Sequence, residues 1–150
     1  MPILNYTTDI EPDETVAEIQ RILVRAGASS VRIDYENGQP ISVSFLLMLN
    51  RQPVPFRIPA NVQGVWLVLQ EQKVERRYKT EKHARRVAWR IVKDWMRAQL
   101  AFIESGQASL PQLFLPHAVR ADGRTLFEVV AADPRLLLGS GDEEDPPAKQ

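Results

Sequence analysis

Residues 31–58, VRIDYENGQPISVSFLLMLNRQPVPFRI, alternate apolar and polar side chains in three runs. Val31 and Ile33 alternate with charged residues in the first run, and Val43 and Phe45 alternate with serines in the second. Alternation with a period of two is typical of strands that bury one face. The sequence therefore predicts three strands with one apolar face each.

Turn signals separate the three runs. Asn37-Gly38 is a hairpin signal, because both residues tolerate a positive φ angle. Asn50-Arg51-Gln52 turns the chain again, into a run that contains Pro53 and Pro55. Since proline cannot donate a backbone hydrogen bond to a neighbouring strand, the third strand should lie at an edge of the sheet.

A helix should precede these strands. Pro12-Asp13-Glu14 places acids in its first turn, and Gly27 can end it. Thr15 and Glu18 have the spacing of a capping box. Apolar residues at intervals of three to four form one face: Val16, Ile19, Leu23 and Ala26.

Three more helices are expected after the strands. Pro59-Ala60-Asn61 caps a short helix, and a long helix should run over residues 80–104 and end at Gly106. Residues 107–124 are interrupted by prolines, and residues 125–132 should form a last short helix. The predicted fold is a single α+β domain over residues 1–138. Its order is α-β-β-β-α-α: a three-stranded antiparallel meander, helices packed on one face, and a long basic helix in the C-terminal half. Residues 139–150, GSGDEEDPPAKQ, should be a disordered acidic tail.

The composition limits the possible functions. The absence of cysteine in the 150 residues excludes disulfides and thiolate metal sites. No apolar run is long enough to span a membrane, and the N-terminus lacks a secretory signal, so we expect a cytoplasmic protein with no membrane partner. His83, which should extend the basic helix, and His117, which should lie in a loop, are the only histidines, and neither has carboxylates spaced to share a metal. We therefore expect no metal and no cofactor.

The charges are unevenly distributed, although the formal net charge is zero. Residues 73–97 contain ten bases and three acids, whereas residues 1–36 contain seven acids and three bases. On the long helix, one apolar stripe should face the core: Ala84, Ala88, Ile91, Trp95, Ala98 and Phe102, broadened by Val87, Val92, Met96 and Ile103. A second stripe is basic: Lys82, Arg86, Arg90, Lys93 and Arg97. At 1.5 Å per residue, this basic ridge would be roughly 22 Å long.

Two interpretations of the ridge are open. Phosphates along a nucleic-acid strand could neutralise it and release counterions, with Arg76, Arg77, Lys79 and Arg85 as further contacts. Alternatively, the ridge is an ordinary solvated face, or it pairs with the acidic first helix. Trp89 lies between Arg85 and Lys93 at helical spacing, so it could be partly exposed among the bases or packed against residues 107–130.

The order helix, three strands, helix resembles the double-stranded-RNA-binding domain, and KTEKHARRVAWRIV resembles the basic start of that domain's last helix. An extra helical segment, residues 61–72, intervenes here. The stretches MPILNYTT, RVAWRIVKDW and FLPHAVRADGRTLFE are similar to small uncharacterised proteins of bacteriophages and mobile elements. That resemblance implies a bacterial or phage cytoplasmic setting and no particular activity.

The predicted function is non-enzymatic binding of a DNA or RNA backbone through the basic helix. Asp34 and the Glu71-Gln72-Lys73 stretch imitate a nuclease motif, but Glu71 falls at the end of a helical pattern rather than on a strand. The alternative is an adaptor or inhibitor that acts on a host protein through an apolar patch near Trp89 or Leu113–Leu115. The sequence leaves open which nucleic acid binds and how many copies of the chain associate.

Overall fold

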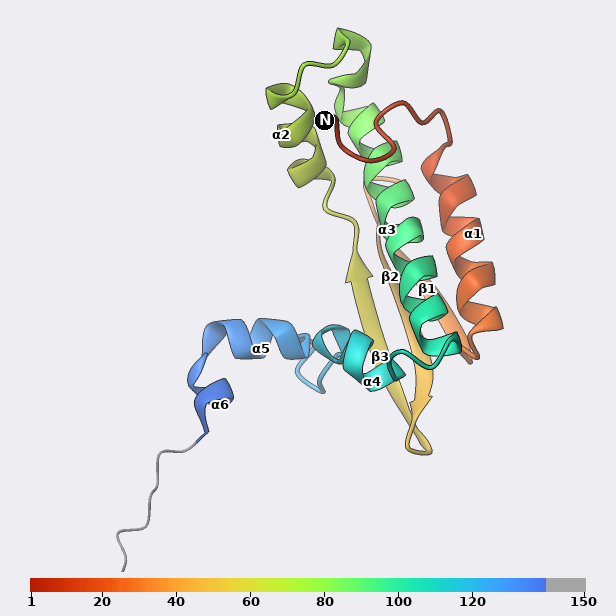
Figure 1. Ribbon diagram of the computed structural model, residues 1–150, viewed down its shortest axis with the longest axis vertical. Helices are drawn as coiled ribbons and strands as arrows, with labels where there is room; N and C mark the ends of the chain where they lie inside the picture. Colours follow the sequence, from red (N-terminus) through yellow and green to blue (C-terminus); the bar gives the residue numbers. More distant parts are fainter. Residues whose placement is uncertain (140–150) are drawn as a thin grey trace, which may run out of the picture.

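The computed structural model describes residues 1–139 (Figure 1). Helix α1 (Pro12–Arg25) precedes a three-stranded antiparallel sheet. The strands β1 (Ser30–Glu36), β2 (Gln39–Leu49) and β3 (Gln52–Pro59) follow one another across this sheet. β3 therefore lies at an edge, as its prolines predict.

The helices after the sheet also match the prediction. Helix α2 (Val62–Glu71) leads through the short 3-10 helix η1 (Arg76–Tyr78) into the long helix α3 (Glu81–Glu104). Small elements complete the described chain: α4 (Leu110–Phe114), the 3-10 helix η2 (Leu115–His117), α5 (Leu126–Ala132) and α6 (Arg135–Leu138). The predicted α+β class and element order are confirmed. Beyond Gly139, the predicted acidic tail lies outside the described residues.

Local sequence signals fix the turns and two of the helix starts. Asn37 and Gly38 have φ angles of 51° and 74°, as the first hairpin turn requires. The Asn61 side chain accepts a hydrogen bond from the Gly64 backbone N–H at 2.9 Å and caps α2. Thr80 caps α3 in the same way, through the His83 backbone N–H at 3.1 Å. A Cβ at position 64 would displace the capping Asn61 side chain, because it would lie 2.7 Å from Asn61 Nδ2.

The predicted capping box at the start of α1 is wrong. The helix begins three residues before Thr15, at Pro12, and Glu11 occupies the cap position without a side-chain bond. Proline at the first helical position already has the φ angle that a helix needs. Thr15 is buried instead, within the first turns of the helix.

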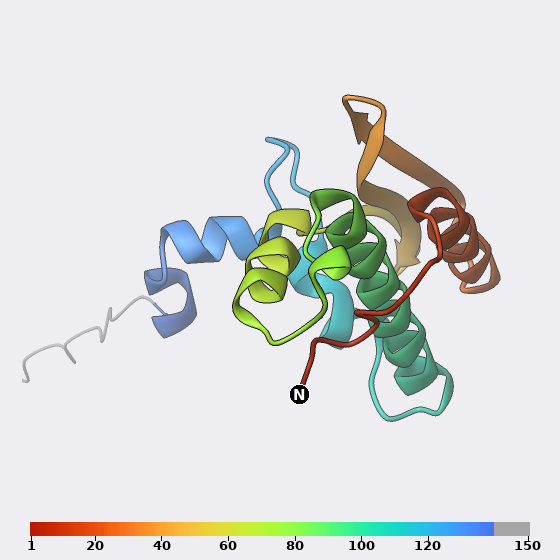
Figure 2. The ribbon, with the colours of Figure 1, turned by 90° about the horizontal axis from the view of Figure 1, so that it is seen from above.

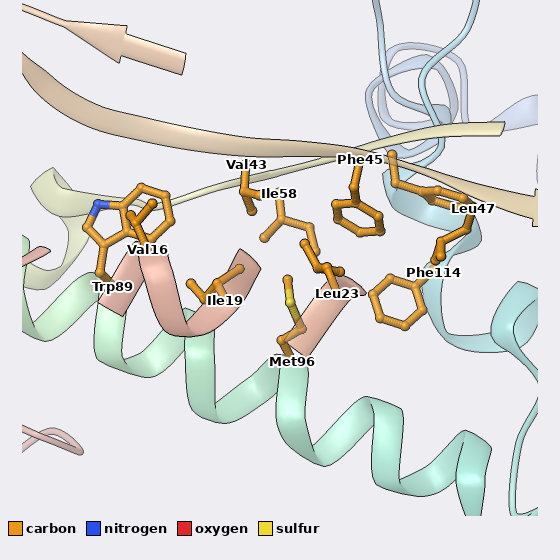
Figure 3. Close-up of a cluster of buried hydrophobic side chains, with 11 residues drawn as sticks. Val16, Ile19, Leu23, Val43, Phe45, Leu47, Ile58, Trp89, Met96 and Phe114 are labelled. Carbon is orange, nitrogen blue, oxygen red and sulfur yellow. The ribbon is translucent and has the colours of Figure 1, made fainter. Parts of the chain in front are cut away.

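Helices α1 and α3 lie side by side on one face of the sheet (Figure 1). The core forms between them and the apolar strand faces, where Val16, Leu23, Phe45 and Met96 meet (Figure 3). Phe45 stacks on Phe56 with ring centroids 5.6 Å apart, and α4 adds Phe114 edge-on to both rings. One continuous apolar cluster thus joins the sheet to α1, α3 and α4.

The buried face of α3 differs from the predicted stripe. Ala84 and Ala88 are buried as predicted, but Ala98 and Phe102 are exposed. Val87 and Met96 are also buried as predicted, and the buried face further includes Trp89, His83 and Lys93, which the prediction left out. The sheet, α1, α2 and the N-terminal residues all pack on this helix, so no single stripe describes its contacts.

The first ten residues cross α3 and attach by hydrogen bonds to it and to the end of α2. The Ile3 backbone N–H donates to Gln72 Oε1 at 2.9 Å, and Asn5 Nδ2 donates to Asp94 Oδ2 at 2.8 Å. The His83 ring, which is buried, places Nε2 against the Tyr6 carbonyl oxygen. Because a carbonyl oxygen only accepts, that nitrogen must carry a proton. The prediction that His83 extends the basic surface is therefore wrong.

Trp89 is fully buried and belongs to the core (Figure 3). Its indole Nε1 donates to the Pro40 carbonyl oxygen at 3.2 Å, so the side chain connects α3 to the start of β2. The two positions considered for it from the sequence, among exposed bases or against residues 107–130, are both replaced by this contact with the sheet.

The burial of Trp89 generates a stability prediction. Trp89→Ala should lower the free energy of unfolding by about 3–5 kcal/mol, because it leaves a large cavity and an unpaired carbonyl. Urea denaturation followed by circular dichroism would measure the change. Tyr35→Ala is the control, because Tyr35 is 55% exposed and should change stability by less than about 0.5 kcal/mol. Equal effects of the two changes would contradict the assignment of Trp89 to the core.

Candidate nucleic-acid interface

The predicted basic ridge of α3 faces α1 over much of its length. Arg86 Nε donates to Glu11 Oε1 at 2.9 Å, and Arg90 Nη1 donates to Glu18 Oε2 at the same distance. Arg90 also reaches the hydroxyl of Thr15 at 3.4 Å. The side chains of Arg86 and Arg90 are only 20% and 13% exposed. The pairing with the acidic first helix, one of the two interpretations of the ridge, therefore describes these two residues.

Lys93 is the most buried base of the ridge, with 9% of its side chain exposed. Its Nζ lies 2.7 Å from Asp94 Oδ1, and Asp94 also accepts the hydrogen bond from Asn5. Burial acts to raise the pKa of Asp94, but the hydrogen bonds from Lys93 and Asn5 outweigh it and hold the pKa below its ordinary value. The hydrogen bond from Asn5 to Asp94 therefore attaches the N-terminal residues to α3, and Lys93 keeps the Asp94 carboxylate charged for it.

A groove of about 860 Å³ lies between the C-terminal halves of α1 and α3. Among its lining residues are five bases, Arg21, Arg25, Arg90, Lys93 and Arg97, and one acid, Glu18. Arg21, Arg25 and Arg97 are exposed, and within residues 1–139 none of them lies in an ion pair. The groove is thus a concentrated positive surface on a protein with no formal net charge.

The groove continues towards the end of α3. A second hollow of about 590 Å³ shares Ile22, Arg25 and Arg97 with it and is otherwise lined mainly by apolar residues, including Leu100 and Ile103. The two hollows together follow the line where α1 and α3 meet. An extended ligand could therefore lie along both helices rather than in a closed pocket.

The remaining predicted bases lie around the other end of α3. Arg76, Arg77 and Lys82 are exposed, and Arg77 pairs with Glu75 at 2.9 Å. Lys79 is half-buried, and its Nζ donates to the Gln70 carbonyl oxygen. Arg85 lies 3.4 Å from Glu81 in a cleft of about 650 Å³ that three acids and two bases line. Acids therefore offset the bases at this end, unlike in the groove.

The sequence interpretation missed Arg21 and Arg25. These two residues are four apart on α1, and so they share one face of that helix. That spacing could have identified them. The count over residues 1–36 gave more acids than bases, and so α1 was treated as acidic throughout. Only the packing of α1 against α3 brings these arginines beside Arg97.

The residues considered for catalysis do not gather into a recognisable centre. Asp34 lies on β1, paired with Arg32 and bonded by the Ser42 hydroxyl, whereas Glu71 ends α2. His117 ends η2 with its ring against Trp95, and burial lowers its pKa. Within residues 1–139, no three His, Cys, Asp or Glu side chains are grouped so as to hold a metal ion. Over the same residues, no helix has the length and apolar character required to cross a bilayer.

The ion pair between Arg90 and Glu18 can be tested by exchanging its charges. Arg90→Glu should lower the free energy of unfolding by on the order of 2 kcal/mol, because it places two carboxylates together in a half-buried site. The double variant Glu18→Arg/Arg90→Glu should recover part of this loss, as measured by urea denaturation. Thermal stability unchanged in Arg90→Glu would show that the pair contributes nothing to the fold.

A second prediction concerns the pH dependence of the Asp94 contacts. A carboxyl group with a lowered pKa stabilises the fold fully above its ordinary value of 3.8, and this stabilisation disappears as the pH falls through the lowered pKa. Asp94→Asn should therefore melt at a lower temperature than the wild type at neutral pH, and the difference should shrink at acid pH. A difference that stays constant down to the acid limit would contradict this linkage.

Comparison with known proteins finds no match: no family model, no curated protein and no solved structure is significantly similar to this chain.

Proposed function

We propose that this protein binds the phosphate backbone of a nucleic acid in the groove between α1 and α3. The observation that carries the proposal is the composition of that groove, with five bases and one acid around about 860 Å³. Guanidinium groups match phosphate oxygens in pairs of hydrogen bonds, and four of the five bases are arginines. The proposal keeps the predicted function and moves its centre along α3 to a surface shared with α1.

The roles of the groove residues follow from their exposure. Arg21, Arg25 and Arg97 are exposed and can turn towards a ligand, so they would supply most of the phosphate contacts. Arg90 and Lys93 are paired with Glu18 and Asp94, so these acids largely offset their charge and the two bases would add little to the phosphate contacts. Arg76, Arg77, Lys79, Lys82, Arg85 and Arg86 would contribute through the charge of the wider surface.

Contacts of this kind orient a nucleic acid without reading its bases, so no sequence preference is expected. If about four phosphates are neutralised, the logarithm of the affinity should fall with the logarithm of the salt concentration with a slope of roughly −3 to −4. The protein would act as a binding accessory factor and not as an enzyme. A bacterial or phage cytoplasmic setting remains part of this proposal.

The groove generates a direct test. Arg21→Glu/Arg25→Glu/Arg97→Glu should bind labelled single-stranded DNA, duplex DNA and RNA at least about a hundredfold more weakly at low salt. Its melting temperature should stay close to that of the wild type, because these side chains are exposed and in no described ion pair. Fluorescence anisotropy would measure the affinity, and gels of the same mixtures with Mg²⁺ would reveal any cleavage.

The control carries the same change of charge elsewhere. Arg32→Glu/Arg51→Glu/Arg120→Glu alters exposed arginines on β1 and on two turns that do not line the groove. This variant should bind nearly as the wild type does. Equal losses in the two triple variants would mean that binding depends on net charge alone. No binding of DNA or RNA by the wild type at low salt would end the proposal.

The alternative function is an adaptor for a host protein. The residues first considered for its apolar patch are mostly buried. Trp89 is buried and cannot serve as its contact, and Phe114 within Leu113–Leu115 is buried too, while Leu115 is 44% exposed. Exposed apolar side chains also lie on α2 (Leu67), α5 (Phe127) and α6 (Leu136–Leu138).

A further inference from the structure

Helices α5 and α6 are rich in apolar residues, yet neither contributes a buried residue to the fold. Phe127 is 63% exposed, and Leu136, Leu137 and Leu138 are 58%, 74% and 83% exposed. A helix with such composition normally lies inside a protein or against a partner. These two helices, together called the C-terminal arm (residues 126–138), therefore present an apolar surface that nothing in the described chain covers.

The C-terminal arm projects from the body of the protein (Figures 1 and 2). Its attachment is local: the Leu126 backbone N–H donates to the Ala118 carbonyl oxygen at 2.8 Å, and Thr125 forms an isolated bridge with Val119. Arg57 on β3 lies 3.6 Å from Glu128. The arm is thus fixed at its base, while its far end extends away from the sheet.

Helix α2 also presents apolar side chains and carries almost no charge. Of its ten residues, VQGVWLVLQE, only Leu69 is buried, and Glu71 is the only charged one. Val62, Val65, Trp66 and Val68 are half-buried and Leu67 is 49% exposed. Its packing within the chain is mainly against α3. Both α2 and the C-terminal arm lie on the β3 side of the molecule, separated along the sheet, while α1 lies on the other side (Figure 1).

We propose that the C-terminal arm of one copy packs on α2 of a second copy, and that the reciprocal contact closes a two-fold dimer. Each chain carries both apolar surfaces but keeps them apart, so a second copy can cover both at once. A two-fold axis satisfies the two contacts together, because each copy donates its arm and receives the other. The near absence of charge on α2 suits a dimer interface, which is more apolar than the average surface.

The exposed area is sufficient for such a dimer. With roughly 150–250 Å² for a large exposed side chain, the fractions for Phe127, Leu136, Leu137 and Leu138 amount to on the order of 500 Å² on each arm. Because the two sides of a contact bury similar areas, one arm on one α2 would bury at most on the order of 1,000 Å² in total, which only reaches the roughly 1,000 Å² expected of a specific interface. Two reciprocal contacts would bury up to on the order of 2,000 Å² and so exceed that threshold.

Sedimentation equilibrium of the full chain tests the proposal. The wild type should show twice the mass of one chain at micromolar concentration. Leu137→Glu and Leu67→Glu should each sediment as monomers with unchanged helical circular dichroism, since both side chains are exposed in the single copy. Val24→Glu is the matched control, because Val24 is 63% exposed on α1, and it should remain a dimer. A wild type that stays monomeric would overturn the proposal.

Cross-linking tests which surfaces meet. The chain contains no cysteine, so Leu67→Cys and Leu137→Cys each introduce a single thiol. If the arm packs on α2, a short thiol-specific cross-linker should join the two variants in a mixture far more efficiently than it joins either variant to itself. Cross-linking of Leu137→Cys alone, as strong as in the mixture, would show arm-to-arm packing and refute the reciprocal arrangement.

Discussion

The ion pair between Arg90 on α3 and Glu18 on α1 fixes how the two helices are aligned, and the position of the basic groove depends on that alignment. The two helices run in the same direction, since Glu11 pairs with Arg86 near the start of α3 and Arg25 lies beside Arg97 near its end. Parallel neighbouring helices bring like partial charges together at each end, which is unfavourable. Oppositely charged side chains across the contact offset this repulsion. The same pair determines which turn of α1 faces which turn of α3.

That register also explains where the basic surface lies. α3 is basic from Lys82 to Arg97, whereas α1 is acidic in its first half and basic in its second. Parallel packing therefore pairs the first half of α1 with bases of opposite charge and brings like charges together in the second half. Like charges held side by side without a described partner cost stability, so their presence favours a ligand that neutralises them. The basic groove is thus a property of two helices and not of one.

Most of the fold could be predicted from the sequence because its signals are local. Alternation in residues 31–58, Asn37-Gly38, the prolines of β3 and the caps Asn61 and Thr80 each determine the structure of their own neighbourhood. The orientation of α3 could not be predicted in this way. Its surface meets the sheet, α1, α2 and the N-terminal residues. Lys93 is therefore buried although it belongs to the basic stripe, and so is Trp89 beside it.

The candidate site was predictable only in part, for the same reason. Arg90, Lys93 and Arg97 were identified from their spacing, but their exposure depends on where α1 places Glu18 and on the contact of Asp94 with Asn5. Arg21 and Arg25 belong to the groove through packing between helices that are far apart in the chain. Charge counts within one segment contain no information about such a pairing.

The attachment of the first ten residues has a consequence for how the chain folds during synthesis. Their hydrogen bonds reach partners 69, 77 and 89 residues away, at Gln72, His83 and Asp94. The strands form from neighbours and can assemble as soon as they leave the ribosome, since closing short loops is fast. Residues 1–10 are therefore translated before the residues that hold them and are among the last to find their place. Until α3 has been translated, these residues lack the hydrogen-bond partners that fix them in the folded protein.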